Sequence, residues 1–216
     1  MTTKSKVAII GLGNIGQAVA ANLAKSNRTF IAADRNVEKA KELSVKWGTS
    51  AQPSDITTAV KEADILVLSI PFGEIGGFLK QNAADLEGKI IVDPSNPIAP
   101  DENGGFKKII DADQSAGQIN TTFLPKDAKL AKALGTLGAG SLAAAAYQKP
   151  DEATLFYATD DKTINTQIEE LIVDNGFAPV RVGDLNQSIR LEVFGDLHEF
   201  GALGKTVTAT EAKSKI

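Results

Sequence analysis

The chain has 216 residues, of which 43% are hydrophobic, so it can bury one substantial core, or one core plus a small appended lobe. A formal net charge of -4 gives no general attraction to nucleic acid or to anionic membranes, and we expect neither as a partner. Cysteine is absent and His198 is the single histidine, which excludes disulfides and thiolate chemistry and leads us to expect no metal site.

A glycine-rich turn follows the first predicted strand, Lys6–Ile10. That strand is too short for a signal segment or a membrane span, so we expect a cytoplasmic protein. The turn has the Gly-x-Gly-x-x-Gly spacing at Gly11, Gly13 and Gly16, and it opens a predicted helix, Asn14–Ser26. In this context the glycines allow a tight turn, close approach of a pyrophosphate and close helix packing.

The turn therefore predicts binding of a nicotinamide dinucleotide at the N-terminus of that helix, where unpaired N–H groups favour an anion. The alternative is a merely tight strand-to-helix turn. The residues expected to contact the cofactor here are Gly11, Leu12, Gly13, Asn14, Ile15 and Gly16.

An acid closes the second predicted strand, Thr29–Ala33. Asp34 stands where an acid usually accepts the ribose hydroxyls of NAD. Arg35 follows it and Lys39 lies one helical turn further on, where both could hold the 2′-phosphate of NADP. The pattern thus leaves NAD and NADP both open; Lys39 could also be a solvated side chain, and Arg35 could stack on adenine.

Further strands and helices alternate along the chain, which predicts an α/β fold: a Rossmann-type, doubly wound, mostly parallel sheet. We assign residues 1–149 to an NAD(P)-binding domain and 150–216 to a small C-terminal α/β lobe that completes the acceptor site. The remaining predicted strands are Ile65–Ile70, Lys89–Val92, Leu130–Leu134, Thr154–Ala158 and Pro179–Val182. The remaining predicted helices are Val37–Trp47, Phe72–Leu86, Thr163–Asn175 and Asn186–Leu203.

Two strand ends are expected to shape the nicotinamide side of the crevice, because ligands of open α/β sheets bind at the carboxyl ends of parallel strands. The first carries Ser69, Ile70 and Pro71. The second leads into Asp93–Gly105, whose prolines and glycine pair predict a long ordered loop. There Asn96 suits a carboxamide, or alternatively fills a turn between two prolines.

The last predicted helix, Asn186–Leu203, holds more apolar residues than a surface helix needs, and on that ground we expect a homodimer. It also contains His198, the one side chain with an unperturbed pKa near neutrality and the natural candidate for proton delivery or for contact with an anionic acceptor. The simpler interpretation of His198 is a packed, hydrogen-bonded residue without a chemical role.

Several motifs in order resemble the coenzyme F420-dependent NADP oxidoreductases and their bacterial relatives. They are Gly11–Gly16, Asp34–Ala40, Ala63–Pro71, Val92–Pro97, Ser115-Ala-Gly, Lys132-Ala-Leu-Gly-Thr136-Leu and Leu155-Phe-Tyr157. The resemblance implies a Rossmann domain with a small C-terminal lobe, dimerisation, and direct hydride transfer between NADPH and a 5-deazaflavin.

The resemblance has two departures. In the family a serine and an arginine hold the 2′-phosphate with a lysine one turn later; Arg35 and Lys39 match, whereas Asp34 stands at the serine. Leu134 and Gly135 replace a phenylalanine and an asparagine near the acceptor pocket. The acceptor is therefore expected to be F420, a flavin, a ferric chelate, a quinone or an unidentified compound.

We accordingly expect an NAD(P)H-dependent oxidoreductase that passes hydride to a flavin-like or deazaflavin-like small molecule, with NADP slightly favoured over NAD. One alternative is a dinucleotide-binding redox sensor without turnover. Another is a reductase of a small carbonyl or imine, which would need a proton donor.

Overall fold

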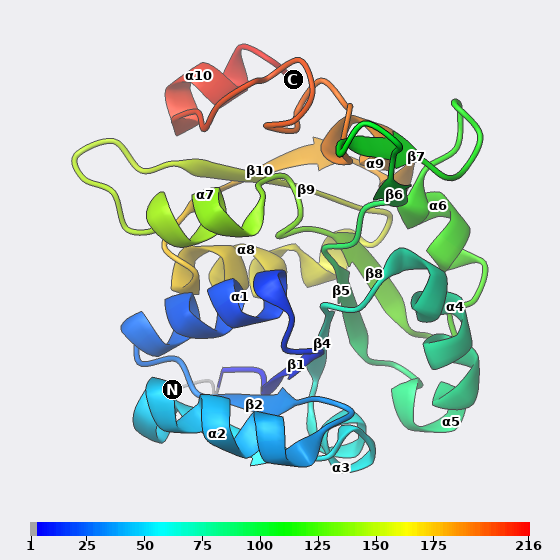
Figure 1. The fold of residues 1–216 in the computed structure, drawn as a ribbon, viewed down its shortest axis with the longest axis vertical. Helices are drawn as coiled ribbons and strands as arrows, with labels where there is room; N and C mark the ends of the chain where they lie inside the picture. Colours follow the sequence, from blue (N-terminus) through cyan, green and yellow to red (C-terminus); the bar gives the residue numbers. More distant parts are fainter. Residues whose placement is uncertain (1–3) are drawn as a thin grey trace.

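The computed structural model describes residues 4–216, which form a sheet with helices on both faces (Figure 1). The strands are β1 (Val7–Ile10), β2 (Phe30–Ala33), β3 (Ala51–Ser54), β4 (Ile65–Leu68), β5 (Ile90–Asp93), β6 (Ile98–Pro100), β7 (Phe106–Lys108), β8 (Lys129–Lys132), β9 (Thr154–Thr159) and β10 (Ala178–Gly183). The helices are α1 (Asn14–Lys25), α2 (Val37–Trp47), α3 (Ile56–Glu62), α4 (Phe72–Gln81), α5 (Ala83–Leu86), α6 (Ala116–Thr121), α7 (Ala139–Ala144), α8 (Asn165–Asp174), α9 (Ser188–Leu191) and α10 (Ala209–Lys213). Short 3-10 turns span Gly48–Ser50, Lys162–Ile164 and Leu185–Gln187.

The main sheet has eight strands in the order β10-β9-β8-β5-β4-β1-β2-β3. The run from β3 to β8 reproduces the Rossmann strand order, and all its neighbouring pairs are parallel. β9 pairs antiparallel with β8, and β10 pairs parallel with β9, so the last two strands run against the other six. The predicted fold class, an α/β protein with a doubly wound, mostly parallel sheet, is confirmed.

The strands at the centre are apolar on both faces because helices cover each side. Val7 and Ile9 of β1 belong to the cluster under α1, α2, α7 and α8, whereas Ala8 and Ile10 belong to the cluster under α3, α4 and α5. A third, smaller cluster lies between β9, β10 and the segments that carry α9 and α10.

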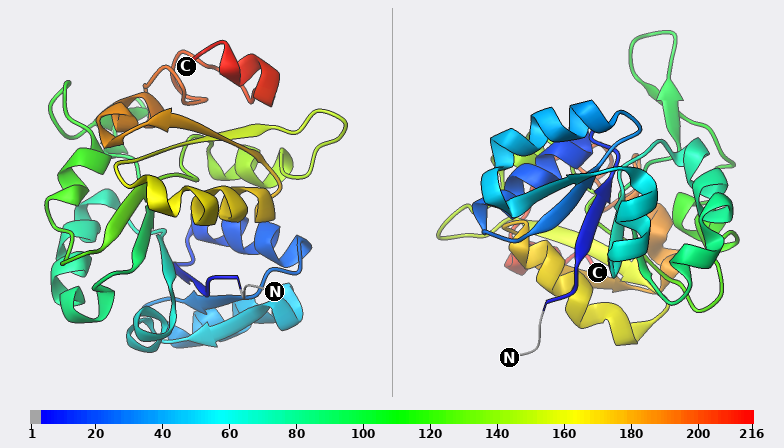
Figure 2. Two further views of the ribbon diagram at one scale, coloured as in Figure 1. Left: turned by 180° about the vertical axis from the view of Figure 1, so that it is seen from behind. Right: turned by 90° about the horizontal axis from the view of Figure 1, so that it is seen from below.

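The C-terminal part shares this sheet. Figure 2 shows β9 and β10 continuing the sheet from β8. The division at residues 149/150 into a Rossmann domain and a small C-terminal lobe stays a prediction. Within residues 4–216, the longest apolar helices fall short of what a membrane crossing requires.

Three expectations about elements were wrong. The stretch Asp93–Gly105 contains β6, which pairs antiparallel with β7 as a hairpin that projects from the body in the right view of Figure 2. The predicted helix Phe72–Leu86 is divided into α4 and α5 at Asn82. Only Ser188–Leu191 of the predicted helix Asn186–Leu203 is α-helical, and turns occupy the rest.

The turns after α9 have a backbone cause. Phe194 has a φ of 76°, which takes the chain out of the helical region. A Cβ at Gly195 would collide with the carbonyl oxygen of Arg190, and one at Gly201 with that of Gly195. The chain therefore folds back tightly on itself between Leu191 and Leu203, which no continuous helix could do.

Candidate functional site

The glycine turn joins β1 to α1 at the centre of the sheet. Gly11 has a φ of +91°, and its N–H donates to the carbonyl of Ala33 at 2.8 Å. A Cβ on Gly16 would collide with the carbonyl oxygen of Gly11, so the close packing needs a glycine there. A Cβ on Gly13 would meet no protein atom within 4 Å. The missing side chain of Gly13 therefore faces open space in front of the turn.

Helix α1 starts at the same place. Gly13 is its N-cap, and within residues 4–216 no side chain caps it. The unpaired N–H groups of the first turn and the helix dipole favour an anion there. Open space beside Gly13 and an uncapped helix N-terminus fit a pyrophosphate, which is the group that the sequence pattern predicts.

Asp34 lies at the end of β2, beside this turn. Its Oδ2 accepts hydrogen bonds from the N–H of Leu12 at 3.0 Å and from Nζ of Lys39 at 2.9 Å, and its Oδ1 accepts from the N–H of Asn36 at 3.1 Å. Burial raises the pKa of Asp34, but the hydrogen bonds from Asn36, Leu12 and Lys39 outweigh it and hold that pKa below its usual value. Asp34 is thus a carboxylate at neutral pH.

The two cations predicted for a 2′-phosphate have different surroundings. Lys39 forms an ion pair with Asp34, whereas the side chain of Arg35 is exposed. Both line the same cavity as Asp34. A negative group beside the ribose would meet the charge of Asp34 and that of Arg35 together, and the Lys39 cation is already partly neutralised.

Two neighbouring cavities run along the carboxyl ends of the strands. The larger, about 710 Å³, is lined by the glycine turn, by Asp34, Arg35 and Lys39, and by residues of α4. The smaller, about 360 Å³, is lined by Asn14, Ile15, Ser95 and Asn96 among others. The residues that line both are Gly13, Ser69, Ile70 and Pro71. Every predicted cofactor-binding residue lines one of the two except Gly16, which lies behind the turn.

Asn96 lines the smaller cavity, but its amide is already engaged. Nδ2 donates to the carbonyl of Gly135 at 3.2 Å, and Oδ1 accepts from the N–H of Val193 at 2.7 Å. Asn96 therefore joins the loop after β5 to the loop after β8 and to the C-terminal segment. Each amide atom retains capacity for one further hydrogen bond, so contact with a carboxamide stays a prediction.

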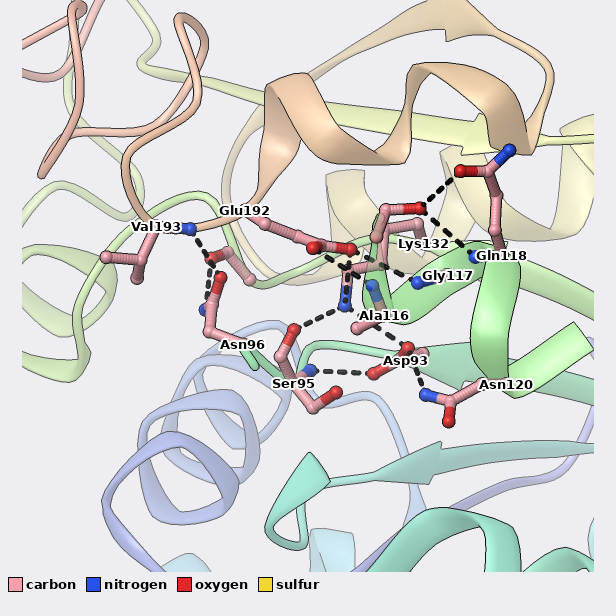
Figure 3. Close-up of polar contacts among 12 residues, drawn as sticks. Asp93, Ser95, Asn96, Ala116, Gly117, Gln118, Asn120, Lys132, Glu192 and Val193 are labelled. Atoms are coloured by element: carbon pink, nitrogen blue, oxygen red, sulfur yellow. Dashed lines mark hydrogen bonds and ion pairs between the residues drawn. The ribbon is translucent and has the colours of Figure 1, made fainter. Parts of the chain in front are cut away.

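A buried cluster of charges lies directly behind Ser95 and Asn96 (Figure 3). Nζ of Lys132 lies 3.2 Å from Oδ2 of Asp93 and 3.7 Å from Oε1 of Glu192, and it also donates to the carbonyl of Ser95. Nδ2 of Asn120 donates to Oδ2 of Asp93 at 2.9 Å. The side chains of Lys132, Asp93 and Glu192 are at most 3% exposed. The cluster joins the ends of β5 and β8 to the C-terminal segment.

The turn after β8 explains one departure from the family pattern. A Cβ at Gly135 would collide with the carbonyl oxygen of Pro94, so the close approach of the two loops excludes the family's asparagine. Leu134 precedes it with a φ of 63° and is fully buried. The residues that replace the family's pair therefore pack against the chain itself.

His198 hydrogen-bonds the backbone of Gly135, which Asn96 also contacts, but it does not reach the cavities. It lines neither cavity, the residue is 1% exposed, and its Nδ1 accepts from the N–H of Phe200 at 2.9 Å. Burial lowers the pKa of His198 to about 4. It is neutral at pH 7, and its catalytic role stays a prediction without geometric support.

Asp93 and Lys132 belong to motifs that carry the resemblance, but the sequence analysis gave no role in the site to them or to Glu192. Asp93 and Lys132 each end a parallel strand, a position that points to the crevice and could have identified them. Glu192 had no such signal, because it lies in a stretch whose apolar spacing favours a helix. The N–H groups that it accepts from, those of Ala116 and Gly117, are far away in the sequence.

Comparison with known proteins supports the resemblance. Residues 6–97 match the family described as NADP oxidoreductase, coenzyme F420-dependent. The F420-dependent NADP reductase of Methanocaldococcus jannaschii is 34% identical over 103 residues, which are 44% of this chain and 46% of that protein. The chain thus matches about half the length of this relative. The resemblance to the family is confirmed over the glycine turn, Asp34 to Lys39 and Ser69 to Asn96.

Solved structures extend the similarity beyond that region. A hypothetical protein from Sinorhizobium meliloti superposes with a TM-score of 0.81 at 27% identity, covering 94% of this chain and 95% of the other. A candidate F420-dependent NADP reductase from Arthrobacter sp. FB24 superposes with a TM-score of 0.70 at 21% identity, covering 85% and 86%. The second likeness shows the shared fold.

Proposed function

We propose that this chain is an NAD(P)H-dependent oxidoreductase that transfers hydride between a nicotinamide cofactor and a flavin-like or deazaflavin-like acceptor. The observation that carries the proposal is the open space at Gly13, which lies where the two cavities meet in front of an uncapped helix N-terminus. The match of residues 6–97 to the F420-dependent NADP oxidoreductases supports the same chemistry.

The larger cavity fits the adenosine half of the cofactor, because Asp34, Arg35 and Lys39 lie there. The smaller cavity then takes the nicotinamide half, next to Ser95 and Asn96. When bound, the nicotinamide supplies the hydride. The chain's part is to orient the ring and to exclude water from it, since direct hydride transfer depends on distance and alignment more than on a protein acid or base.

NADP is the favoured cofactor. Arg35 is exposed at the cavity and can form charge-assisted hydrogen bonds to a 2′-phosphate. Asp34 opposes that phosphate but is partly neutralised by Lys39. The balance predicts moderate discrimination, so NADH should also bind.

The first test is a calorimetric titration of NADPH and NADH. We expect tighter binding of NADPH, and we expect Arg35→Ala to weaken NADPH binding roughly tenfold or more while changing NADH binding little, because a charge-assisted hydrogen bond is worth about 1.5–3 kcal/mol. Lys41→Ala is the matched control, since Lys41 lies on α2 but pairs with Glu38. Equal losses for both nucleotides in Arg35→Ala would contradict the assignment of the 2′-phosphate.

The acceptor is tested by following NADPH oxidation with coenzyme F420, FMN, a quinone and a ferric chelate. Transfer of deuterium from the 4-position of labelled NADPH to a deazaflavin would demonstrate direct hydride transfer.

Binding of dinucleotide without turnover of any acceptor would instead support a redox sensor. Turnover of a small carbonyl or imine that is lost in His198→Ala would support the third candidate. Homodimerisation and a cytoplasmic location stay predictions.

A further inference from the structure

The buried cation of Lys132 is the feature that the proposed function does not yet use. Its residue is 2% exposed, and Nζ lies between the carboxylates of Asp93 and Glu192. Burial also raises the pKa of Glu192 despite the nearby cation. Charged groups in a protein interior carry a desolvation penalty that their mutual attraction often only offsets, so such a cluster is weak as a source of stability. Its role is better sought in the groups that it holds in place.

The cluster holds both backbone groups of Ser95. Its N–H donates to Oδ1 of Asp93 at 2.7 Å, and its carbonyl accepts from Nζ of Lys132 (Figure 3). The peptide units around Ser95 are therefore fixed from two sides by a single ion pair. Ser95 and the following Asn96 form one wall of the smaller cavity.

The same cluster also holds the C-terminal segment that hydrogen-bonds Asn96. Glu192 accepts from the N–H groups of Ala116 at 3.0 Å and Gly117 at 3.1 Å, which anchors it to the start of α6. The next residue, Val193, donates its N–H to Oδ1 of Asn96. Lys132 thus contacts Ser95 directly and reaches Asn96 through Glu192 and Val193.

We propose that Lys132 is a positioning residue for the nicotinamide end of the site: together with Asp93 and Glu192 it fixes the Ser95–Asn96 wall against which the nicotinamide ring is oriented. This inference rests on the proposed function. Lys132 itself lines neither cavity, so it acts through Ser95 and Asn96.

The test compares two ligands that differ only at the nicotinamide end, NADPH and 2′-phospho-ADP-ribose. In Lys132→Met we expect the affinity for 2′-phospho-ADP-ribose to stay within about twofold, because the larger cavity is untouched. The preference for NADPH over that ligand should fall toward unity. With an active acceptor, kcat should fall by on the order of 100-fold, as small misplacements of reacting groups do, with less change in KM.

Lys89→Met is the matched control. Lys89 precedes β5 at the end of the sheet away from the cavities, and its Nζ donates to the carbonyls of Val60, Lys61 and Ala63. Like Lys132, it is a lysine whose Nζ donates hydrogen bonds to backbone carbonyl groups. Lys89→Met should lower the melting temperature without changing the preference between the two ligands.

Removal of Lys132 alone could unfold the chain, because it leaves Asp93 and Glu192 buried without a cation. The double variant Lys132→Met/Glu192→Gln leaves Asp93 as the single remaining charge, so the net charge of the cluster is the same as in the wild type, and the introduced amide oxygen can accept from one of the two N–H groups at the start of α6. It should show the same loss of ligand preference. A folded variant of either kind with wild-type preference and kcat, or with equal losses for both ligands, would overturn the inference.

Binding of the two ligands by the wild-type protein distinguishes failure of the proposed function from failure of the role of Lys132. If it binds neither ligand, the proposed function fails, and the inference with it. If it binds both equally, dinucleotide binding stands, but the nicotinamide ring makes no contact with the Ser95–Asn96 wall and the inference is overturned.

Discussion

A methyl group added at Gly13 and one added at Gly16 should have opposite consequences. Gly13 has a φ of -76° in extended backbone and open space at its Cβ position, so alanine fits the unliganded protein. At Gly16 the same methyl group collides with the carbonyl of Gly11, an overpacking that costs about 1–3 kcal/mol or more.

We therefore expect Gly13→Ala to keep the wild-type melting temperature and to lose dinucleotide binding by tenfold or more, because the methyl group occupies the space of the pyrophosphate. Gly16→Ala should melt several degrees lower. Thermal unfolding with and without NADPH measures both effects. Wild-type binding by Gly13→Ala would place the phosphates away from the turn.

The charge of Asp34 should set how far the site discriminates between the two cofactors. Asp34→Asn keeps an oxygen that can accept from the N–H of Leu12, but it removes the repulsion of a 2′-phosphate and releases Lys39 from its ion pair. We expect the ratio of NADPH to NADH affinity to rise roughly tenfold or more, in line with about 1.5–3 kcal/mol for a charged hydrogen bond. Calorimetry of both nucleotides measures the ratio. An unchanged ratio would mean that the ribose does not reach Asp34.

At this scale the sequence predicts part of the lining of the larger cavity. Gly11, Leu12, Gly13 and Asp34 belong to a spacing that is fixed locally, by one strand, one turn and one helix, and all four line that cavity; that they bind a cofactor stays a prediction. The partners of Lys132 could not be predicted in this way. Glu192 lies at the end of α9, where the chain leaves the helix, and contacts Lys132 from there. No pattern of neighbouring residues predicts that the helix ends at this point.

The segment from Ser188 to Gly201 is the element whose structure departs most from expectation, and His198 makes its stability sensitive to pH. Burial lowers the pKa of His198 to about 4, whereas the unfolded chain titrates near 6.5. Between those values the unfolded state binds a proton that the folded state does not, so stability is full above pH 6.5 and falls as the pH drops toward 4.

We expect this one group to cost the wild type roughly 2–3 kcal/mol between pH 7.5 and pH 4.5. His198→Asn removes the titration and leaves an oxygen placed to accept from the N–H of Phe200. The free energy of unfolding in urea, measured for both proteins at both pH values, isolates the difference. Parallel losses in the two proteins would show that His198 titrates normally.

Three strands that the sequence analysis missed, β3, β6 and β7, have a physical reason in common. β3 reads Ala-Gln-Pro-Ser and has no apolar run because it is an edge strand with exposed residues, where proline is tolerated. β6 and β7 project from the body, so they carry no buried pattern either. Of the apolar set that suggested a dimer, Leu191, Val193 and Leu197 are buried within this chain, whereas Phe194 and Phe200 are exposed.

At the scale of the whole molecule, the alternation of strands and helices was enough to predict the fold class, because each parallel crossover needs a helix. It could not give the direction of the last two strands. β9 enters the sheet antiparallel beside β8, after the long connection through α7, and β10 follows it in parallel through α8. The length of a connection does not determine which way the next strand points, so the C-terminal region could be predicted as α/β but not oriented.

The hydrogen bond between Asn96 and Val193 has a consequence for synthesis of the chain, because its two ends are made at different times. Every residue that lines the larger cavity lies between Ile10 and Asn82 and leaves the ribosome early. By contrast, the hydrogen bonds that hold Asn96 in the wall of the smaller cavity cannot all form until Glu192 and Val193 have emerged. The N-terminal part of a chain can fold first. Under the proposed function, a nascent chain could therefore bind the adenosine half of the dinucleotide before the site for the nicotinamide ring is complete.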